Sequence, residues 1–188
     1  ARYVRGLTEA LVAMDPTERG FTVGTYSHSW DGSTHRPFGV PHLGTVLGVR
    51  QWRLALLAGH LFRRTTLPGL NRFRWFLATD MAVPFAAPEA VIATIHDLTT
   101  ITHPETHSLL TRVNARLALS RIRARGYRVV ANSQRTARDA VQLGLIPQSR
   151  ITVIHPGVTQ SFLTPPDSEA IEAALQRYGV TRPFVLTV

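Results

Sequence analysis

The sequence has no cysteine and no lysine, and it has few acidic residues. Without cysteine, the 188-residue chain forms neither disulfide bonds nor thiolate metal sites. All 21 basic residues are arginine, against 12 aspartates and glutamates, which gives a formal net charge of +9. Arginine pairs well with phosphate, so the excess is compatible with phosphorylated ligands, anionic lipid headgroups or nucleic acid. Because the arginines are not interleaved with aromatic residues at base-stacking spacing, we expect no nucleic-acid partner.

Long apolar runs and targeting segments are also missing. The longest apolar stretch, residues 82–95, is interrupted by two prolines and Glu89, and it therefore predicts no transmembrane span. No basic, apolar and small-residue series typical of a signal peptide opens the sequence, so we expect a cytoplasmic protein. The length allows one domain with a sizeable core and the beginning of another.

Three short apolar segments each run directly into polar residues. They cover residues 90–95, 128–131 and 151–154. Continuous apolar runs of this length are typical of parallel strands that are covered on both faces. The carboxyl ends of such strands meet at one edge of the sheet, where ligands usually bind. The sequence therefore predicts that one edge collects His96, Asp97, Asn132, Ser133 and His155.

Helical segments separate these strands. Residues 108–125 predict a helix that ends at Gly126, and a second helix runs from Ser133 to about Leu143. The apolar residues available for the sheet face of the first helix are Leu109, Leu110, Val113, Leu117 and Ile122. Alternating strands and helices predict right-handed parallel crossovers, and hence an α/β fold with a Rossmann-like doubly wound parallel sheet.

The first half of the sequence has a weaker pattern. Residues 1–14 and 51–64 predict helices, residues 21–26 and 73–79 predict strands, and residues 27–48 predict a long loop. Because a doubly wound fold places a strand before its first helix, we expect the opening strand of the domain to be missing.

The end of the sequence suggests a hinge and a new domain. The pairs Pro156-Gly157 and Pro165-Pro166 interrupt the pattern as a linker does. A helix is predicted from Asp167 or Ser168 to Tyr178, followed by an apolar strand at residues 183–188.

Several motifs occur in a distinctive order. They are Thr94-Ile95-His96-Asp97-Leu98, Pro104-Glu105, Val130-Ala131-Asn132-Ser133, Val153-Ile154-His155-Pro156-Gly157-Val158 and Arg182-Pro183-Phe184-Val185-Leu186. In this order and spacing they resemble glycosyltransferase family 4, a group of retaining enzymes. The similarity is close over residues 90–188, looser over residues 1–16 and faint over residues 17–89.

The resemblance implies the GT-B architecture, in which two Rossmann-like domains face each other across a cleft. Residues 1–164 then correspond to the N-terminal, acceptor-side domain without its first strand. Residues 165–188 correspond to the linker, first helix and first strand of the donor-binding domain. The implied reaction moves a sugar from a nucleotide-sugar to a glycan or a lipid-linked acceptor without a protein nucleophile and without a metal cofactor. Because the diphosphate-binding motifs of the family are absent, we expect this chain alone to be inactive.

The resemblance also implies roles for single residues. The family histidine that matches His96 points towards the donor sugar and contacts a hydroxyl, which suits an imidazole with one donor and one acceptor nitrogen. His96 is therefore the catalytic candidate, and the alternative is a histidine that only holds the strand end. Asp97 and Ser133 are substrate-binding candidates. Alternatively, Asp97 accepts backbone N–H groups in its turn and Ser133 caps a helix. The loop from Ser27 to Thr45 is a further candidate for lining the acceptor site.

Two other functions are weighed against this interpretation. The eight histidines predict no metal site, because none forms a helical His-x-x-x-His pair and His103 and His107 straddle Pro104. A protein of another class, a non-catalytic Rossmann-like module that binds a ligand or partner through its basic surface, remains the alternative.

A membrane contact is a further alternative. The segment from Arg50 to Arg64, followed by Arg72, Arg74 and Trp75, mixes arginine with large apolar residues, as a peripheral membrane helix does. An ordinary helix packed on the sheet explains the same pattern. If the membrane interpretation holds, the protein lies at the inner face of a membrane.

Overall fold

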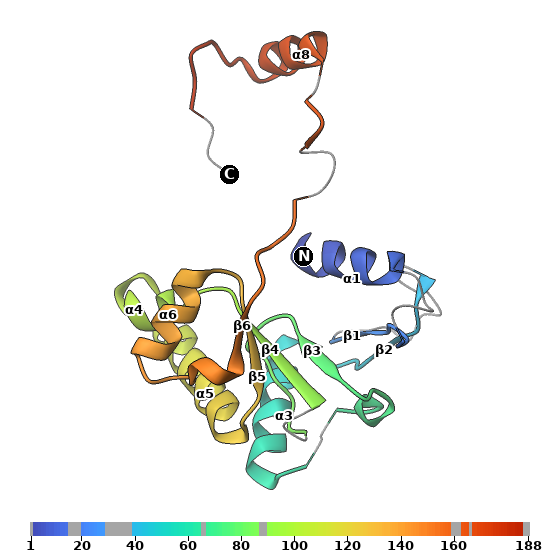
Figure 1. The fold of residues 1–188 in the computed structure, drawn as a ribbon, viewed down its shortest axis with the longest axis vertical. Helices are drawn as coiled ribbons and strands as arrows, with labels where there is room; N and C mark the ends of the chain where they lie inside the picture. Colours follow the sequence, from blue (N-terminus) through green and yellow to red (C-terminus); the bar gives the residue numbers. More distant parts are fainter. Residues whose placement is uncertain are drawn as a thin grey trace. The chain divides into compact units, whose positions relative to one another are not determined.

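The chain folds as two units, residues 1–156 and residues 157–188 (Figure 1). Their boundary coincides with the Pro156-Gly157 pair. The computed structural model describes residues 2–14, 20–28, 39–64, 67–86, 90–158, 163–165 and 167–185.

The first unit contains a four-stranded parallel sheet. Its strands follow the order β3-β4-β5-β6, and residues such as Ile95 and Ala131 pair in register across β4 and β5. The bounds are Phe76–Ala78 for β3, Val91–Ile95 for β4, Arg128–Ala131 for β5 and Ile151–Val153 for β6. The strands predicted from the three apolar runs are therefore confirmed, and the parallel sheet with its helices is a Rossmann-like α/β arrangement.

A second, two-stranded parallel sheet precedes the first along the chain. It pairs β1 (Thr25–Ser27) with β2 (His42–Gly44). The strand predicted at residues 21–26 is shorter and later than expected. The predicted loop at residues 27–48 contains β2, which was missed because a three-residue strand shows no periodicity. Residues 29–38 of that loop lie outside the described part of the chain.

Capping residues mark the ends of the longest helix, α5. Ser108 accepts a hydrogen bond from the Thr111 backbone N–H at the start of α5, and Gly126, with φ +73°, ends that helix. The bounds are Arg2–Ala13 for α1, Val49–Phe62 for α3, Leu109–Arg125 for α5 and Gln134–Gln142 for α6. Shorter helical segments are α4 (Thr99–Thr102) and the 3-10 turns Leu70–Arg72, Pro104–Thr106 and Gln148–Arg150.

The main core lies between the four-stranded sheet and the helices α5 and α6, which Figure 1 shows together on one side of the sheet. The residues of α5 that face this core are Ala115, Ala118, Leu119 and Ile122. The predicted sheet face was therefore wrong for Leu109, Leu110, Val113 and Leu117, which are exposed. These four residues form an i, i+3, i+4 and i+7 series, and two of them are small alanines, so the larger exposed leucines and Val113 lie on the side away from the sheet.

The longest described element of the second unit is the helix α8 (Ser168–Tyr178). The Asp167 carboxylate accepts a hydrogen bond from the Ala170 N–H at 2.6 Å, and an ion pair of 2.7 Å joins Arg182 to Glu172. The strand predicted at residues 183–188 is not formed over residues 183–185. Residues 186–188 lie outside the described part of the chain.

Candidate functional site

The carboxyl ends of β3 and β4 meet at His96. The imidazole Nε2 lies 2.9 Å from the backbone carbonyl oxygen of Thr79, the residue that follows β3. A carbonyl oxygen only accepts hydrogen bonds, so Nε2 carries the proton and donates it. In the neutral ring this tautomer leaves Nδ1 as an acceptor. His96 is half-buried, which gives the imidazole both a fixed orientation and access to solvent.

A second contact fixes the same imidazole. The ring of Tyr3, in the first turn of α1, meets the His96 ring edge-on, with centroids 5.0 Å apart and an interplanar angle of 89°. The N-terminal end of α1 therefore lies at the carboxyl edge of the sheet. Apolar periodicity predicted the helix but gave no signal for this contact between residues far apart in the sequence.

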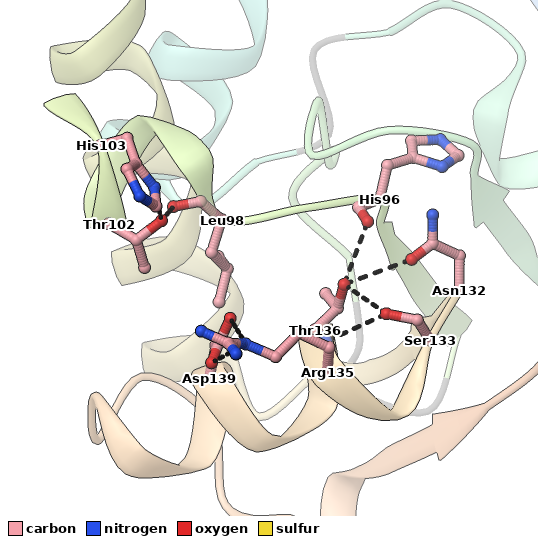
Figure 2. A network of polar contacts seen from close by, with 9 residues as sticks. All are labelled: His96, Leu98, Thr102, His103, Asn132, Ser133, Arg135, Thr136 and Asp139. Atoms are coloured by element: carbon pink, nitrogen blue, oxygen red, sulfur yellow. Dashed lines mark hydrogen bonds and ion pairs between the residues drawn. The ribbon is translucent and has the colours of Figure 1, made fainter. Parts of the chain in front are cut away.

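The backbone of His96 is tied to the start of α6. The Thr136 hydroxyl oxygen lies 3.1 Å from the His96 carbonyl oxygen, 3.3 Å from Asn132 Oδ1 and 2.9 Å from Ser133 Oγ. Figure 2 shows the His96 carbonyl directed at Thr136 while the ring points away from it. Sequence reasoning missed Thr136, and the only available signal was its place three residues after the Ser133 cap.

Ser133 is the N-cap of α6. Its hydroxyl oxygen accepts a hydrogen bond of 3.0 Å from the Thr136 backbone N–H. This geometry satisfies one of the free donors at the helix start, as the capping alternative predicts. Its role in substrate binding stays a prediction.

Asp97 faces a different group of residues from the one around His96. Its Oδ1 accepts hydrogen bonds from the Thr99 backbone N–H at 2.9 Å and from the Thr99 hydroxyl at 2.5 Å. These two bonds make Asp97 a turn-forming residue ahead of α4, and substrate binding by it stays a prediction.

The same bonds set the ionisation of Asp97 and the orientation of His107. The hydrogen bond from the Thr99 hydroxyl has the largest effect and holds the pKa of Asp97 below its usual value. Burial opposes it, and the Thr99 N–H and the nearby imidazoles of His107 and His96 lower the pKa further. Since the Thr99 hydroxyl donates to Asp97, it accepts from His107 Nε2 at 3.0 Å. A polar chain of three side chains therefore lies at the exposed start of α4.

The remaining predicted residues are less closely tied to His96. His155 is exposed and lies two residues after β6, at the same sheet edge. In the loop from Ser27 to Thr45, the His42 ring bridges β1 and β2, with Nδ1 2.7 Å from Thr25 Oγ1 and Nε2 3.1 Å from Ser27 Oγ. This ring stabilises the small sheet.

A hollow of about 860 Å³ adjoins the site, and residues of α1, β1 and β3 line it. Its lining includes Thr79, whose carbonyl oxygen binds His96. Much of the remaining wall is apolar and includes Val4, Leu7 and Leu11 of α1 and Tyr26, Phe76 and Ile92.

Among the described residues, no three histidine, aspartate or glutamate side chains converge as metal ligands. Nor does any described helix combine the length and the apolar character that crossing a membrane requires.

The sequence was also compared with known families. The model of "Glycosyltransferase Family 4" matches residues 1–162, most of the chain and all of the sheet. The chain belongs to glycosyltransferase family 4. A comparison with curated proteins found no match. Membership of family 4 confirms the resemblance carried by the motifs and makes the chain a glycosyltransferase module.

Proposed function

We propose that this family 4 chain forms the acceptor side of a retaining glycosyltransferase. The enzyme moves a sugar from a nucleotide-sugar donor to a glycan or a lipid-linked acceptor. Residues 1–164 receive the acceptor, and residues 165–188 begin the domain that binds the donor. The leaving diphosphate is neutralised by basic side chains and helix N-termini, so the reaction needs no metal.

The observation that carries this proposal is the fixed imidazole of His96. Its Nε2–H is already committed to the Thr79 carbonyl, and the Tyr3 ring restricts its rotation. Nδ1 is then a preorganised acceptor for a sugar hydroxyl at the carboxyl edge of a parallel sheet, where such folds bind ligands. His96 therefore orients the reacting sugar and does not attack it.

The decisive experiment replaces His96 in a polypeptide that also contains the donor-binding domain. We expect His96→Ala to lower turnover about 100-fold, because a small displacement of a reactant has a cost of this size. The thermal midpoint should change little, since truncation at a half-buried strand end opens no large core cavity. His96→Gln should recover part of the rate through one remaining hydrogen bond.

The control substitution removes the imidazole of a different histidine, His103. His103 is exposed and its Nδ1 lies 3.0 Å from the Thr102 hydroxyl, away from Thr79. His103→Ala should therefore retain normal turnover. Near wild-type turnover of His96→Ala, together with a marked fall in thermal midpoint, would assign His96 a purely structural role and contradict the proposal.

The rival function is a non-catalytic binding module, which predicts no turnover of a sugar donor. A polypeptide with both domains should release nucleoside diphosphate from a sugar donor only if the glycosyltransferase proposal is right. The 188-residue chain alone should transfer no sugar and bind nucleotide-sugars weakly. Calorimetric titration with common donors measures this affinity, and a micromolar dissociation constant would contradict the division of roles between the two domains.

A further inference from the structure

The helix α3 has a second apolar face that the fold does not bury. Trp52, Leu56 and Gly59 pack into the protein. Leu54, Leu57 and Leu61 are 63%, 41% and 72% exposed. At 100° per residue these three leucines fall within one narrow sector of the helix, on the side away from the buried residues. We call these three leucines the outer stripe.

Only positive charge surrounds the outer stripe within its segment. Arg50, Arg53, Arg63 and Arg64 are exposed and lie on α3 or directly after it. Residues 32–79 contain no aspartate or glutamate. Among the described residues, no ion pair neutralises any of these four arginines. The helix therefore combines exposed leucines with uncompensated guanidinium groups.

We propose that the outer stripe and its arginines dock on the surface of an anionic lipid bilayer. The leucines bury in the boundary between headgroups and acyl chains, and the arginines bind lipid phosphates above them. A second copy of this chain suits the surface less well, because two faces rich in arginine repel each other. The helix lies on the membrane and does not cross it.

A second exposed stripe lies on α5. Leu109, Leu110 and Leu117 are also exposed, and residues 106–138, like residues 32–79, contain no aspartate or glutamate. The α5 stripe therefore offers the same apolar residue type in a segment that is also basic. Replacing its leucines tests whether binding belongs to the outer stripe of α3, and an equal loss of binding in the α3 and α5 variants would overturn the assignment to α3.

The test is cosedimentation of the 188-residue chain with lipid vesicles. We expect binding to vesicles of phosphatidylcholine with about one third phosphatidylserine, weak binding to pure phosphatidylcholine, and release as salt rises from about 0.1 M to about 0.5 M. The variant Leu54→Ser/Leu57→Ser/Leu61→Ser should bind at least about 10-fold more weakly, because it removes apolar area from the contact. Arg50→Gln/Arg53→Gln should lose about five-fold for each arginine.

The control variant Leu109→Ser/Leu110→Ser/Leu117→Ser should bind as the wild type does, and all variants should keep the wild-type circular dichroism and thermal midpoint. Equal binding to neutral vesicles, or unchanged binding of the outer-stripe variant, would overturn the proposal. Self-association of the wild type that the outer-stripe variant abolishes would assign the surface to a second copy and overturn it too. None of these measurements depends on sugar transfer, so they test the surface independently of the proposed reaction.

Discussion

At the scale of single residues, Tyr127 joins the core to the loop before β4. Its side chain is 0% exposed, and its hydroxyl donates to the Pro84 carbonyl oxygen at 2.9 Å and accepts from the Ala86 N–H at 3.1 Å. Both hydrogen bonds end on this one oxygen. A residue that follows α5 in sequence therefore fixes a loop about forty positions earlier.

We expect Tyr127→Phe to lower the free energy of unfolding by about 1–3 kcal/mol, because it leaves two backbone groups without this partner. Urea unfolding of the purified chain measures the change. Tyr178, which is largely exposed on α8, provides the control, and Tyr178→Phe should be neutral. Equal effects of the two substitutions would show that the Tyr127 hydroxyl contributes nothing specific.

His60 is a residue whose charge opposes folding. Burial lowers its pKa below the ordinary 6.5, and Arg121 and Arg125 lower it further, against the effect of its hydrogen bond to the Val83 carbonyl. The folded state therefore favours the neutral ring. Below about pH 6.5 the unfolded chain takes up the proton first, so this part of the stability is present above that pH and is lost as the pH falls.

We expect the thermal midpoint of the wild type to fall more between pH 7.5 and pH 5 than that of His60→Gln, which has no group to protonate there. Calorimetry at a series of pH values measures the two slopes. Identical slopes for wild type and His60→Gln would rule out the predicted coupling.

At the scale of elements, the start of α6 shows how a cap and a candidate site share residues. Ser133 satisfies the Thr136 N–H, and the Thr136 hydroxyl contacts the His96 carbonyl. Stabilising the helix start therefore also positions the residue at the end of β4.

We expect Ser133→Ala to lower the free energy of unfolding by about 1 kcal/mol and Ser133→Asp to restore most of it, because aspartate also caps helices. Denaturant unfolding measures both variants, with the exposed Ser120→Ala as control. If transfer activity rises and falls with stability in Ser133→Ala, Ser133→Asp and Ser120→Ala, Ser133 acts only as a cap. A loss of activity in Ser133→Asp despite restored stability would instead support a direct contact with substrate.

Among the described residues of the first unit, β1 pairs only with β2 and β3 only with β4, so each of these strands has one edge without a strand partner. One edge of β1 and one edge of β3 line the hollow of about 860 Å³. A parallel strand between them would end at the carboxyl edge, where Tyr3 begins α1 beside His96. An extended segment added ahead of Arg2 is therefore expected to pair with one of these edges.

We expect a chain that carries an extended apolar segment ahead of Arg2 to gain stability and to protect the backbone amides of β1 and β3 from hydrogen exchange. A segment of the same length made of glycine and serine is the control. Exchange rates that are equal in the two extended chains would contradict the predicted pairing.

At the scale of the whole molecule, the two units differ in how many buried residues they contain: no described residue of 157–188 is buried. None of the residues of α8 is buried, and the first unit contains the complete four-stranded sheet. The core of the first unit therefore consists of residues that precede the boundary.

We expect a chain that ends at Pro156 to unfold within about 2 °C of the full chain. Differential scanning calorimetry gives the comparison. A chain that ends at Gln148 loses β6, which pairs with β5, and should be strongly destabilised or unfolded. A large fall in midpoint for the chain ending at Pro156 would mean that residues 157–188 stabilise the first unit.

The sequence by itself determined the alternation of strands and helices from residue 90 to residue 154. These elements depend on short-range patterns, namely apolar runs, helical spacing, the cap at Ser133 and the terminator at Gly126, and each was found where the pattern predicted it. The parallel sheet was predicted from the alternation of strands and helices. His96 and Asn132 were placed at one edge by the same logic.

Only the tertiary structure decided which faces are buried and which atoms are engaged. The outward position of Leu109 and the outer stripe of α3 depend on what packs beside each helix, and periodicity alone does not specify a partner. The same holds for the imidazole of His96, whose Nε2 binds a carbonyl that lies 17 residues earlier in the chain. Burial and hydrogen-bond direction depend on residues that are distant in sequence, so a local sequence pattern does not predict them.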